Sequence, residues 1–288
     1  MKLYLYIIIL MTDLISVDSL TYKVLVPNIS DICNCIKQCH MFLIQLIHNI
    51  KKFCTIHNMD ESHGYMHFIR VLLHASNACR YENILFTDKF AIFAASLLHD
   101  VDDAKYFNTP NFDNARNLLL TTIEMSGDNL PVFITDDWKT LVIKMISLVS
   151  CSKNGNALPD GYPEWMLIPR IADRLDALGE IGIERTIAFN NIKGRNIHKE
   201  DIKSAYPQAQ LNYIATLERF NQYVKGITEL TTIGHIYDKL IHIGRPEYFG
   251  ITNKYLVDEA NKSRIEMEQF VLKYWKDLHY EEVYDRIC

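Results

Sequence analysis

Two neighbouring residues, His99 and Asp100, follow a mostly apolar run from Phe90 to Leu98 that has the character of a buried helix. Side chains that follow one another on a helix point in different directions, so an imidazole and a carboxylate can converge only on something held between helices. A divalent metal ion is the simplest group that would need both ligands.

Two other segments place single ligand-type residues in apolar surroundings. His67 lies on a helix face that is otherwise apolar, and Asp173 lies one turn before Asp176 in a similar segment. A histidine alone on such a face is more often a core residue with one hydrogen bond. The order of the residues along the chain favours the ligand interpretation, and the predicted metal ligands are His67, His99, Asp100 and Asp173.

Two imidazoles and two carboxylates make a mixed nitrogen and oxygen site. Such a site suits Mn²⁺ or Mg²⁺, which we favour, and also accommodates Co²⁺, Ni²⁺, Fe²⁺ or Zn²⁺. Four protein ligands on an octahedral ion leave about two positions for a phosphoryl oxygen and a water molecule.

Two charged residues follow the doublet closely. Asp103 lies about one turn beyond Asp100 and is the natural carboxylate to orient or deprotonate the attacking water, or to protonate a leaving group. Lys105 adds a positive charge near the same place. We predict a catalytic role for both residues.

Arg70 and His63 flank His67 and are candidates for substrate binding. Arg70 lies one turn after His67 and has the planar geometry to hold two phosphate oxygens at once. A structural salt bridge from Arg70 to Asp173 or Asp176 is the alternative. His63 could bind substrate or could cap and pair locally at the start of the helix.

The order of these motifs resembles the HD-domain superfamily of metal-dependent phosphohydrolases, which are all-helical proteins. The matching stretches include the His99-Asp100 doublet, and they lie at residues 63–71, 97–105, 172–186 and 234–240. The closer likeness is to small bacterial HD hydrolases, some of which are nucleotide pyrophosphohydrolases, and it covers roughly residues 41–276. The resemblance implies a substrate-binding role for Lys239 and, for a pyrophosphohydrolase, cleavage between the α and β phosphates of a nucleoside triphosphate.

Two details refine the resemblance. HD phosphodiesterases with two ions carry extra histidines after the doublet, whereas this chain has none between Asp100 and His198, so we expect one ion. Ile171 stands two positions before Asp173, where the family usually has another acidic residue. The metal ligand Asp173 is retained, but this chain lacks the further carboxylate and any role that it has in the family.

Composition restricts the classes of partner. The chain has 288 residues, of which 49% are hydrophobic, and a formal net charge of −5. It can bury a large core, and its charge argues against binding a long nucleic acid. We expect a small phosphorylated substrate, most simply a nucleotide, and homodimer formation is left open.

The N-terminus and the cysteines bear on location. The apolar run from Leu3 to Met11 is too short for a membrane span; it fits a buried segment, with a weak signal or anchor as the alternative. Seven cysteines in a chain of this length do not form a dense disulfide framework, which favours a reducing compartment and a cytoplasmic protein. The cluster from Cys33 to His40 lacks a second ligand pair, so buried or surface thiols are favoured over a zinc site.

Helical periodicity continues almost without a break after residue 40. Helices are expected at residues 41–53, 61–80, 88–100, 111–126, 135–150, 208–230, 234–243 and 252–278, with one more around Asp173. The sequence therefore predicts an all-α protein, an HD-domain helical bundle at residues 41–288 with a short N-terminal extension at residues 1–40. Metal-dependent hydrolysis is the favoured function, and a catalytically silent nucleotide-binding or scaffold protein is the alternative.

Overall fold

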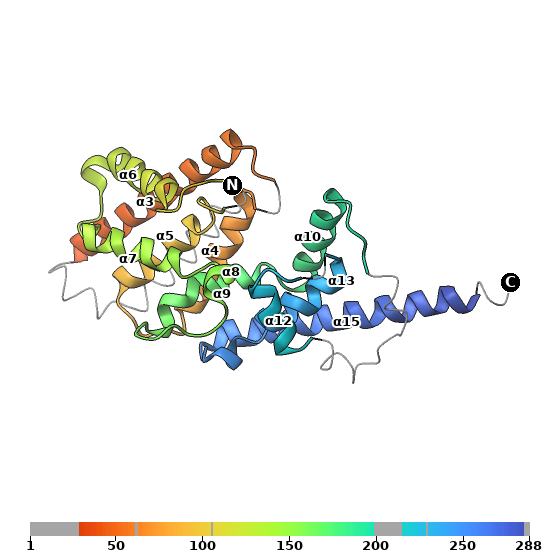
Figure 1. Ribbon diagram of the computed structural model, residues 1–288. Helices are drawn as coiled ribbons and strands as arrows, with labels where there is room; N and C mark the ends of the chain where they lie inside the picture. Colours follow the sequence, from red (N-terminus) through yellow and green to blue (C-terminus); the bar gives the residue numbers. More distant parts are fainter. Residues whose placement is uncertain (1–28, 61–62, 105, 199–214, 229, 285–288) are drawn as a thin grey trace. The chain divides into compact units, whose positions relative to one another are not determined.

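The structure of the protein, a computed structural model, describes residues 29–60, 63–104, 106–198, 215–228 and 230–284. Every regular element in these ranges is a helix, so the predicted all-α class is confirmed (Figure 1). The chain forms two compact units. Unit 1 comprises residues 1–149 and 161–173, and unit 2 comprises residues 150–160 and 174–288.

Unit 1 is built around helix α5 (Phe86–Leu98), whose residues are nearly all buried. A helix that is apolar on every side must be covered on every side. α4 (Tyr65–Cys79) and α7 (Asp136–Ser147) pack most extensively on α5, while α3 (Ile29–Ile56) contacts both α5 and α6 (Asp113–Ser126). The doublet His99-Asp100 follows directly on the end of this central helix.

Two short connections complete unit 1. The 3₁₀ turn η1 (Gly127–Asn129) follows α6, and the 3₁₀ turn η2 (Glu164–Leu167) leads into α9 (Ile168–Leu175). The buried Arg170 donates from Nε to the carbonyl oxygen of Leu148 at 2.6 Å, just beyond the end of α7. This hydrogen bond joins α9 to the end of α7. It thereby helps to position Asp173, which lies one turn later on α9.

Unit 2 contains the remaining described helices. They are α8 (Cys151–Asn154), α10 (Gly179–Ile192), α12 (Leu217–Val224), α13 (Thr232–His235), the π turn η3 (Ile236–Leu240), α14 (Ile241–Ile243), the 3₁₀ turn η4 (Pro246–Phe249) and α15 (Lys254–Tyr284). α10 packs against α15, and α12 packs against η3.

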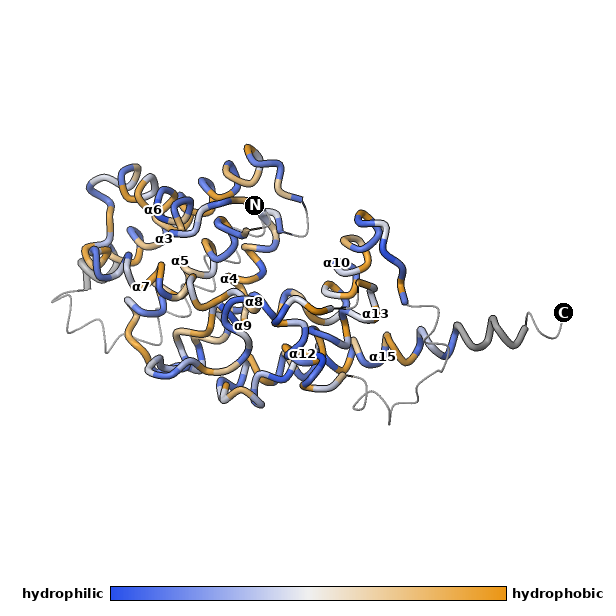
Figure 2. Tube along the Cα trace, viewed as in Figure 1, coloured by the Kyte–Doolittle hydropathy of each residue, from blue (hydrophilic) through white to orange (hydrophobic). Residues whose placement is uncertain are grey.

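The long helix α15 is amphipathic, with hydrophobic and hydrophilic residues interleaved along it (Figure 2). Its buried residues recur at helical spacing, and they are Leu256, Ala260, Met267, Val271 and Trp275. The indole Nε1 of Trp275 donates to the hydroxyl of Tyr237 at 2.9 Å, which ties α15 to η3.

Most predicted helices are found with shifted ends. The predicted helix at 41–53 begins earlier, because α3 starts at Ile29, and the predicted helix at 208–230 ends at Val224. α10 was not predicted as a separate helix. The division at residue 40 stays a prediction, since residues 1–28 lie outside the described part.

Within the described residues, no helix combines the length and the apolar character that crossing a membrane requires. The predicted apolar segment at residues 3–11 lies outside those residues, so the alternatives for the N-terminus and the cytoplasmic location stay predictions. The five cysteines that the structure describes at side-chain level, at positions 35, 39, 54, 79 and 151, are free thiols. This agrees with the expectation of thiols in preference to a disulfide framework.

Candidate metal centre

The structure brings the four predicted metal ligands together in unit 1. One nitrogen or oxygen atom from each of them lies within 4.8 Å of the corresponding atoms of the other three, and the residues are His67, His99, Asp100 and Asp173. They come from α4, from the turn after α5, and from α9. Both histidines are buried, and the two aspartates are partly exposed.

The distances within this group suit a metal ion. The two Nε2 atoms of His67 and His99 are 3.0 Å apart, and Oδ1 of Asp173 is 3.4 Å from each of them. Oδ2 of Asp100 lies 3.6 Å from Nε2 of His67 and 3.7 Å from Nε2 of His99. Ligands about 2.1 Å from an ion and at right angles lie about 3.0 Å apart, so the two imidazoles match neighbouring coordination positions.

The orientation of His99 is fixed by the helix that precedes it. Its Nδ1 lies 2.9 Å from the carbonyl oxygen of Ser96, one turn back in α5, so Nδ1–H donates to the backbone. This tautomer leaves the lone pair of Nε2 directed at the other ligands. Phe68, beside His67 on α4, packs edge-on against the His99 ring, with 5.5 Å between ring centroids.

The two aspartates make this group strongly attractive to positive charge. Burial opposes the charged form of His99, but Asp100 and Asp173 outweigh it and raise the pKa of that imidazole. Burial also opposes ionisation of Asp173, yet hydrogen bonds from His67 and His99 hold the pKa of its carboxyl well below the usual range. The donor set therefore fits a divalent cation, which would satisfy both carboxylates and both imidazoles at once.

A second group adjoins the first and shares Asp100 with it. The ligand atoms of His63, Asp100 and Asp103 also lie within 4.8 Å of one another. The structure thus places Asp103 and His63, two of the predicted functional residues, beside the predicted metal ligands.

Tyr106 belongs to this neighbourhood and was not predicted. Its hydroxyl donates to the carboxylate of Asp60 and lies 3.3 Å from Nδ1 of His63. Burial and the carboxylate of Asp60 raise the pKa of Tyr106, so the phenol stays protonated. Its position three residues after Asp103, joined to it by a backbone hydrogen bond of 2.9 Å, was the available signal.

The turn that carries the doublet is anchored to α6. Both carboxylate oxygens of Asp102 accept from first-turn amides of that helix, from Asn114 at 3.0 Å and from Ala115 at 2.9 Å. The side-chain amide of Asn114 donates in return to the carbonyl oxygen of Val101 at 2.8 Å. These bonds hold the backbone between Asp100 and Asp103.

The other predicted residues are placed as follows. Arg70 lies on α4, one turn after His67, and Asp176 pairs with Arg185 at 2.7 Å. Lys239 lies on η3 in unit 2, with Nζ 5.6 Å from the centre of the Tyr223 ring. Lys105 lies outside the described residues. Ile171 is 2% exposed, so the position that is usually acidic is part of the core here.

The chain resembles a viral protein over most of its length. It is 39% identical over 229 residues to the uncharacterized protein L803 of Acanthamoeba polyphaga mimivirus, which covers 78% of this chain and 93% of that protein. No family model matches the chain.

Solved bacterial structures have the same fold. A Lactobacillus plantarum protein matches with a TM-score of 0.57 and 22% identity, over 83% of this chain and 97% of its own. Bacillus subtilis YpgQ in complex with ADP matches with a TM-score of 0.54 and 20% identity, over 85% and 96%. An HD-superfamily hydrolase from Bacillus thuringiensis matches with a TM-score of 0.53 and 21% identity, over 83% and 98%.

Proposed function

This chain belongs to the same family as the mimivirus protein L803 and has the HD-domain fold, and we propose that it is a metal-dependent phosphohydrolase. One observation carries the proposal. Four ligand atoms from His67, His99, Asp100 and Asp173 face one another within 4.8 Å, and the group of His63 and Asp103 adjoins them through Asp100.

The residues of the two groups are proposed to have different roles in hydrolysis. A divalent ion in the four-ligand group would polarise a phosphoryl oxygen and acidify a water molecule. We assign Asp103 the role of accepting the proton of the attacking water, because its carboxylate lies in the group that adjoins Asp100. His63, held between Asp60 and Tyr106, presents a second proton-carrying group on the same side.

Cations would hold the phosphates. Arg70 follows His67 by one turn on α4 and can take two phosphate oxygens through its guanidinium. We assign Lys105 and Lys239 to the same task from the sequence motifs, Lys105 also being a candidate for neutralising developing charge during the reaction.

The substrate class is the finer part of the proposal. We propose a nucleotide, with cleavage of a nucleoside triphosphate between its α and β phosphates. The support is the motif resemblance together with the likeness in fold to Bacillus subtilis YpgQ, which was solved in complex with ADP. Mn²⁺ or Mg²⁺ is the proposed ion, one per chain.

The alternative is a protein that binds a metal and a nucleotide without turnover. Asp103 speaks against it, because a purely structural metal site does not need a further carboxylate beside the ligands. The two functions differ in whether intact protein converts a nucleotide and in whether Asp103 matters for that conversion.

A panel of nucleoside triphosphates tests the proposal directly. Purified protein with Mn²⁺ or Mg²⁺ should release a nucleoside monophosphate and pyrophosphate from at least one of them, with bound metal measured in parallel. His67→Ala and Asp173→Ala should each lose the ion and the activity together.

Two matched controls remove similar side chains from exposed positions. His48→Ala on α3 and Asp136→Ala at the start of α7 should keep both the ion and the activity. Full metal occupancy in His67→Ala or Asp173→Ala would refute the ligand assignment. Binding without cleavage of any nucleotide, equal in wild type and Asp103→Ala, would establish the alternative.

A further inference from the structure

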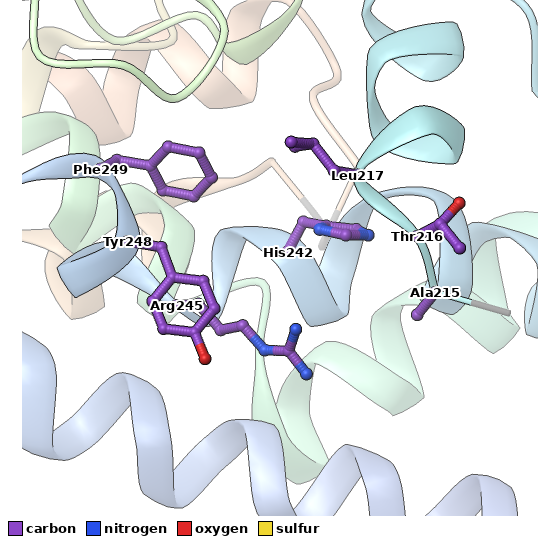
Figure 3. A pocket seen from close by; sticks show the side chains of 7 residues that line it. All are labelled: Ala215, Thr216, Leu217, His242, Arg245, Tyr248 and Phe249. Carbon is purple, nitrogen blue, oxygen red and sulfur yellow. The ribbon is translucent and has the colours of Figure 1, made fainter. Parts of the chain in front are cut away.

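Unit 2 contains a cavity of about 570 Å³, a size typical of small-molecule sites. Residues of two segments line it. The loop and first turn of α12 contribute Thr216 and Leu217, and the stretch from α14 to η4 contributes His242, Arg245, Tyr248 and Phe249. In Figure 3, His242 lies between the two aromatic residues on one side and the Thr216 segment on the other.

His242 lines this cavity and has one ring nitrogen without a hydrogen-bond partner in the described part of the chain. The residue is only 6% exposed, and among the described residues its Nε2 has no hydrogen-bond partner. Burial and the nearby Arg245 lower the pKa of His242 to about 4, so the imidazole is neutral near pH 7.

The tautomer of His242 follows from its other contacts. The ring is hydrogen-bonded to the backbone of Thr216 and Ala215, which favours the protonated form and therefore uses a ring N–H as donor. Because Nε2 is the unpartnered nitrogen, we assign the donor role to Nδ1 and the acceptor role to Nε2. A buried acceptor without a partner is costly, so a ligand that brings an N–H or O–H group would be favoured.

Arg245 gives the cavity a positive charge. Its guanidinium lies 3.8 Å from the carboxylate of Glu268, which is too far for a hydrogen bond. Glu268 is in closer contact with Arg264, so one carboxylate is shared by two guanidinium groups. The pair of arginines therefore keeps a net positive charge, and Arg245 can accept an anionic group.

The first turn of α12 favours an anion at the same cavity. The Thr216 hydroxyl accepts from the amide of Arg219 at 3.3 Å, which satisfies one of the first amides of the helix. The amide of Phe220 donates to the carbonyl oxygen of Thr216, whereas the amides of Leu217 and Glu218 have no intrahelical acceptor. The helix dipole makes this end electropositive. Tyr248 and Phe249 add two aromatic rings on the opposite side.

We propose that this cavity binds a nucleoside monophosphate or a compound of the same chemistry. The phosphate would meet Arg245 and the start of α12, and a planar ring would lie against Phe249 or Tyr248. An exocyclic amino or ring N–H group of the base would pair with the imidazole of His242, which lines the cavity. The inference stands on these contacts alone and does not require that the metal centre hydrolyses anything.

Binding is measured by isothermal titration calorimetry on the full chain carrying Asp173→Ala, in EDTA, so that the metal centre has no ion. The probes are the four common nucleoside monophosphates, with adenosine and inorganic phosphate as partial probes. At least one nucleotide should bind with a stoichiometry of one and more tightly than either partial probe.

Two variants locate the binding. Arg245→Met removes the charge and His242→Phe removes the acceptor while keeping a ring, and each should weaken binding about tenfold or more. Arg116→Met, the same substitution on α6 of unit 1, is the matched control and should bind as before. Melting temperatures verify that each variant is folded, and Arg245→Met suffices if His242→Phe fails to fold.

The outcomes are separable from those of the hydrolysis assay, which uses wild-type protein and added metal. Absence of binding at millimolar nucleotide, or binding that neither variant weakens, would overturn the inference. Phosphate that binds as tightly as the nucleotides would also overturn it, because the ring contacts would then contribute nothing.

Discussion

Asp103 is the residue on which the chemistry of the proposed hydrolase depends. It is not in the four-ligand group, but its carboxylate lies within 4.8 Å of ligand atoms of His63 and Asp100. Asp103→Asn keeps the size of the side chain and removes the basic carboxylate. We expect the ion to remain and the turnover number to fall about 10²- to 10⁴-fold, with little change in KM.

Steady-state kinetics with metal analysis on the same samples measures this effect. Asp128→Asn, at an exposed position in η1, is the control. Turnover equal to wild type in Asp103→Asn would remove Asp103 from the mechanism.

His242 predicts a pH dependence of stability. Its pKa is about 4 in the folded protein and 6.5 in its ordinary state, so the unfolded chain takes up the proton first on acidification. The contribution to stability is fully present above about pH 6.5 and is lost as the pH falls towards 4, by about 1.4 kcal/mol for each unit of difference. Thermal unfolding at pH 7.5 and 5.0 should therefore show a larger loss in wild type than in His242→Phe, and equal losses would contradict the assignment.

At the scale of residues, the sequence predicted the convergence of His67, the doublet and Asp173, because motif order and apolar context are visible in one dimension. The positions of Tyr106 and His242 were not predicted. Tyr106 matters through a contact with Asp60, 46 positions away, and His242 through the shape of a cavity formed by two separate segments. The spacing of hydrophobic residues along the sequence indicates neither the contact of Tyr106 with Asp60 nor the cavity at His242.

The turn after α5 is held in place because Asp102, which lies in this turn, caps the N-terminus of another helix, α6. Phe112 is the N-cap of α6 and has a left-handed backbone with φ of 58°, and its side chain cannot accept a hydrogen bond. Asp102 takes over this task for Asn114 and Ala115. The residue thereby links the start of α6 to the turn that carries Asp100.

Asp102→Ala should therefore destabilise the protein by about 1–2 kcal/mol, the usual cost of a lost cap with a charged acceptor. It should also weaken metal binding, because the turn loses its anchor. Chemical denaturation and metal titration measure the two effects, with Asp128→Ala as the control. A variant as stable as wild type would show that the amides of α6 find another acceptor at no cost.

Gly182 is required where α10 begins. A Cβ at this position would lie 2.1 Å from the carbonyl oxygen of Ala177, which is backbone and cannot move aside. Gly182→Ala should cost about 1–3 kcal/mol in spite of the higher helix propensity of alanine. Glu184→Ala, exposed on the same helix, should change the unfolding free energy by less than about 0.5 kcal/mol, and an equally small effect of Gly182→Ala would refute the clash.

At the scale of elements, hydrophobic spacing predicted the helices that carry a continuous apolar stripe, such as α5 and α15. It missed the ends. The predicted helix at 88–100 included the doublet, whereas α5 ends at Leu98 and the turn that follows aims the ligands. The predicted helix at 234–243 is helical throughout but contains the π turn η3, which a fixed period of 3.6 residues cannot reveal.

For the whole molecule, the four predicted ligands all lie in unit 1, although they are far apart along the chain. An ion held by α4, by the turn after α5 and by α9 ties together segments that the chain joins only through long connections. Its binding energy adds to the stability of the folded unit, because the unfolded chain does not present the four ligands together. Unit 2 contains none of the four ligands, so it has no direct share in this stabilisation.

Metal removal should accordingly affect the two units unequally. At a free ion concentration one hundred times the Kd, the ion should stabilise unit 1 by about 2.7 kcal/mol, and EDTA should abolish this gain. Hydrogen exchange with and without Mn²⁺ should show the difference as greater protection of α4, α5 and α9, with α15 little changed. Asp173→Ala is the control and should show no response to the ion. An equal gain of protection in α15, or a response that persists in Asp173→Ala, would mean that the ion binds elsewhere than at the four residues assigned to it.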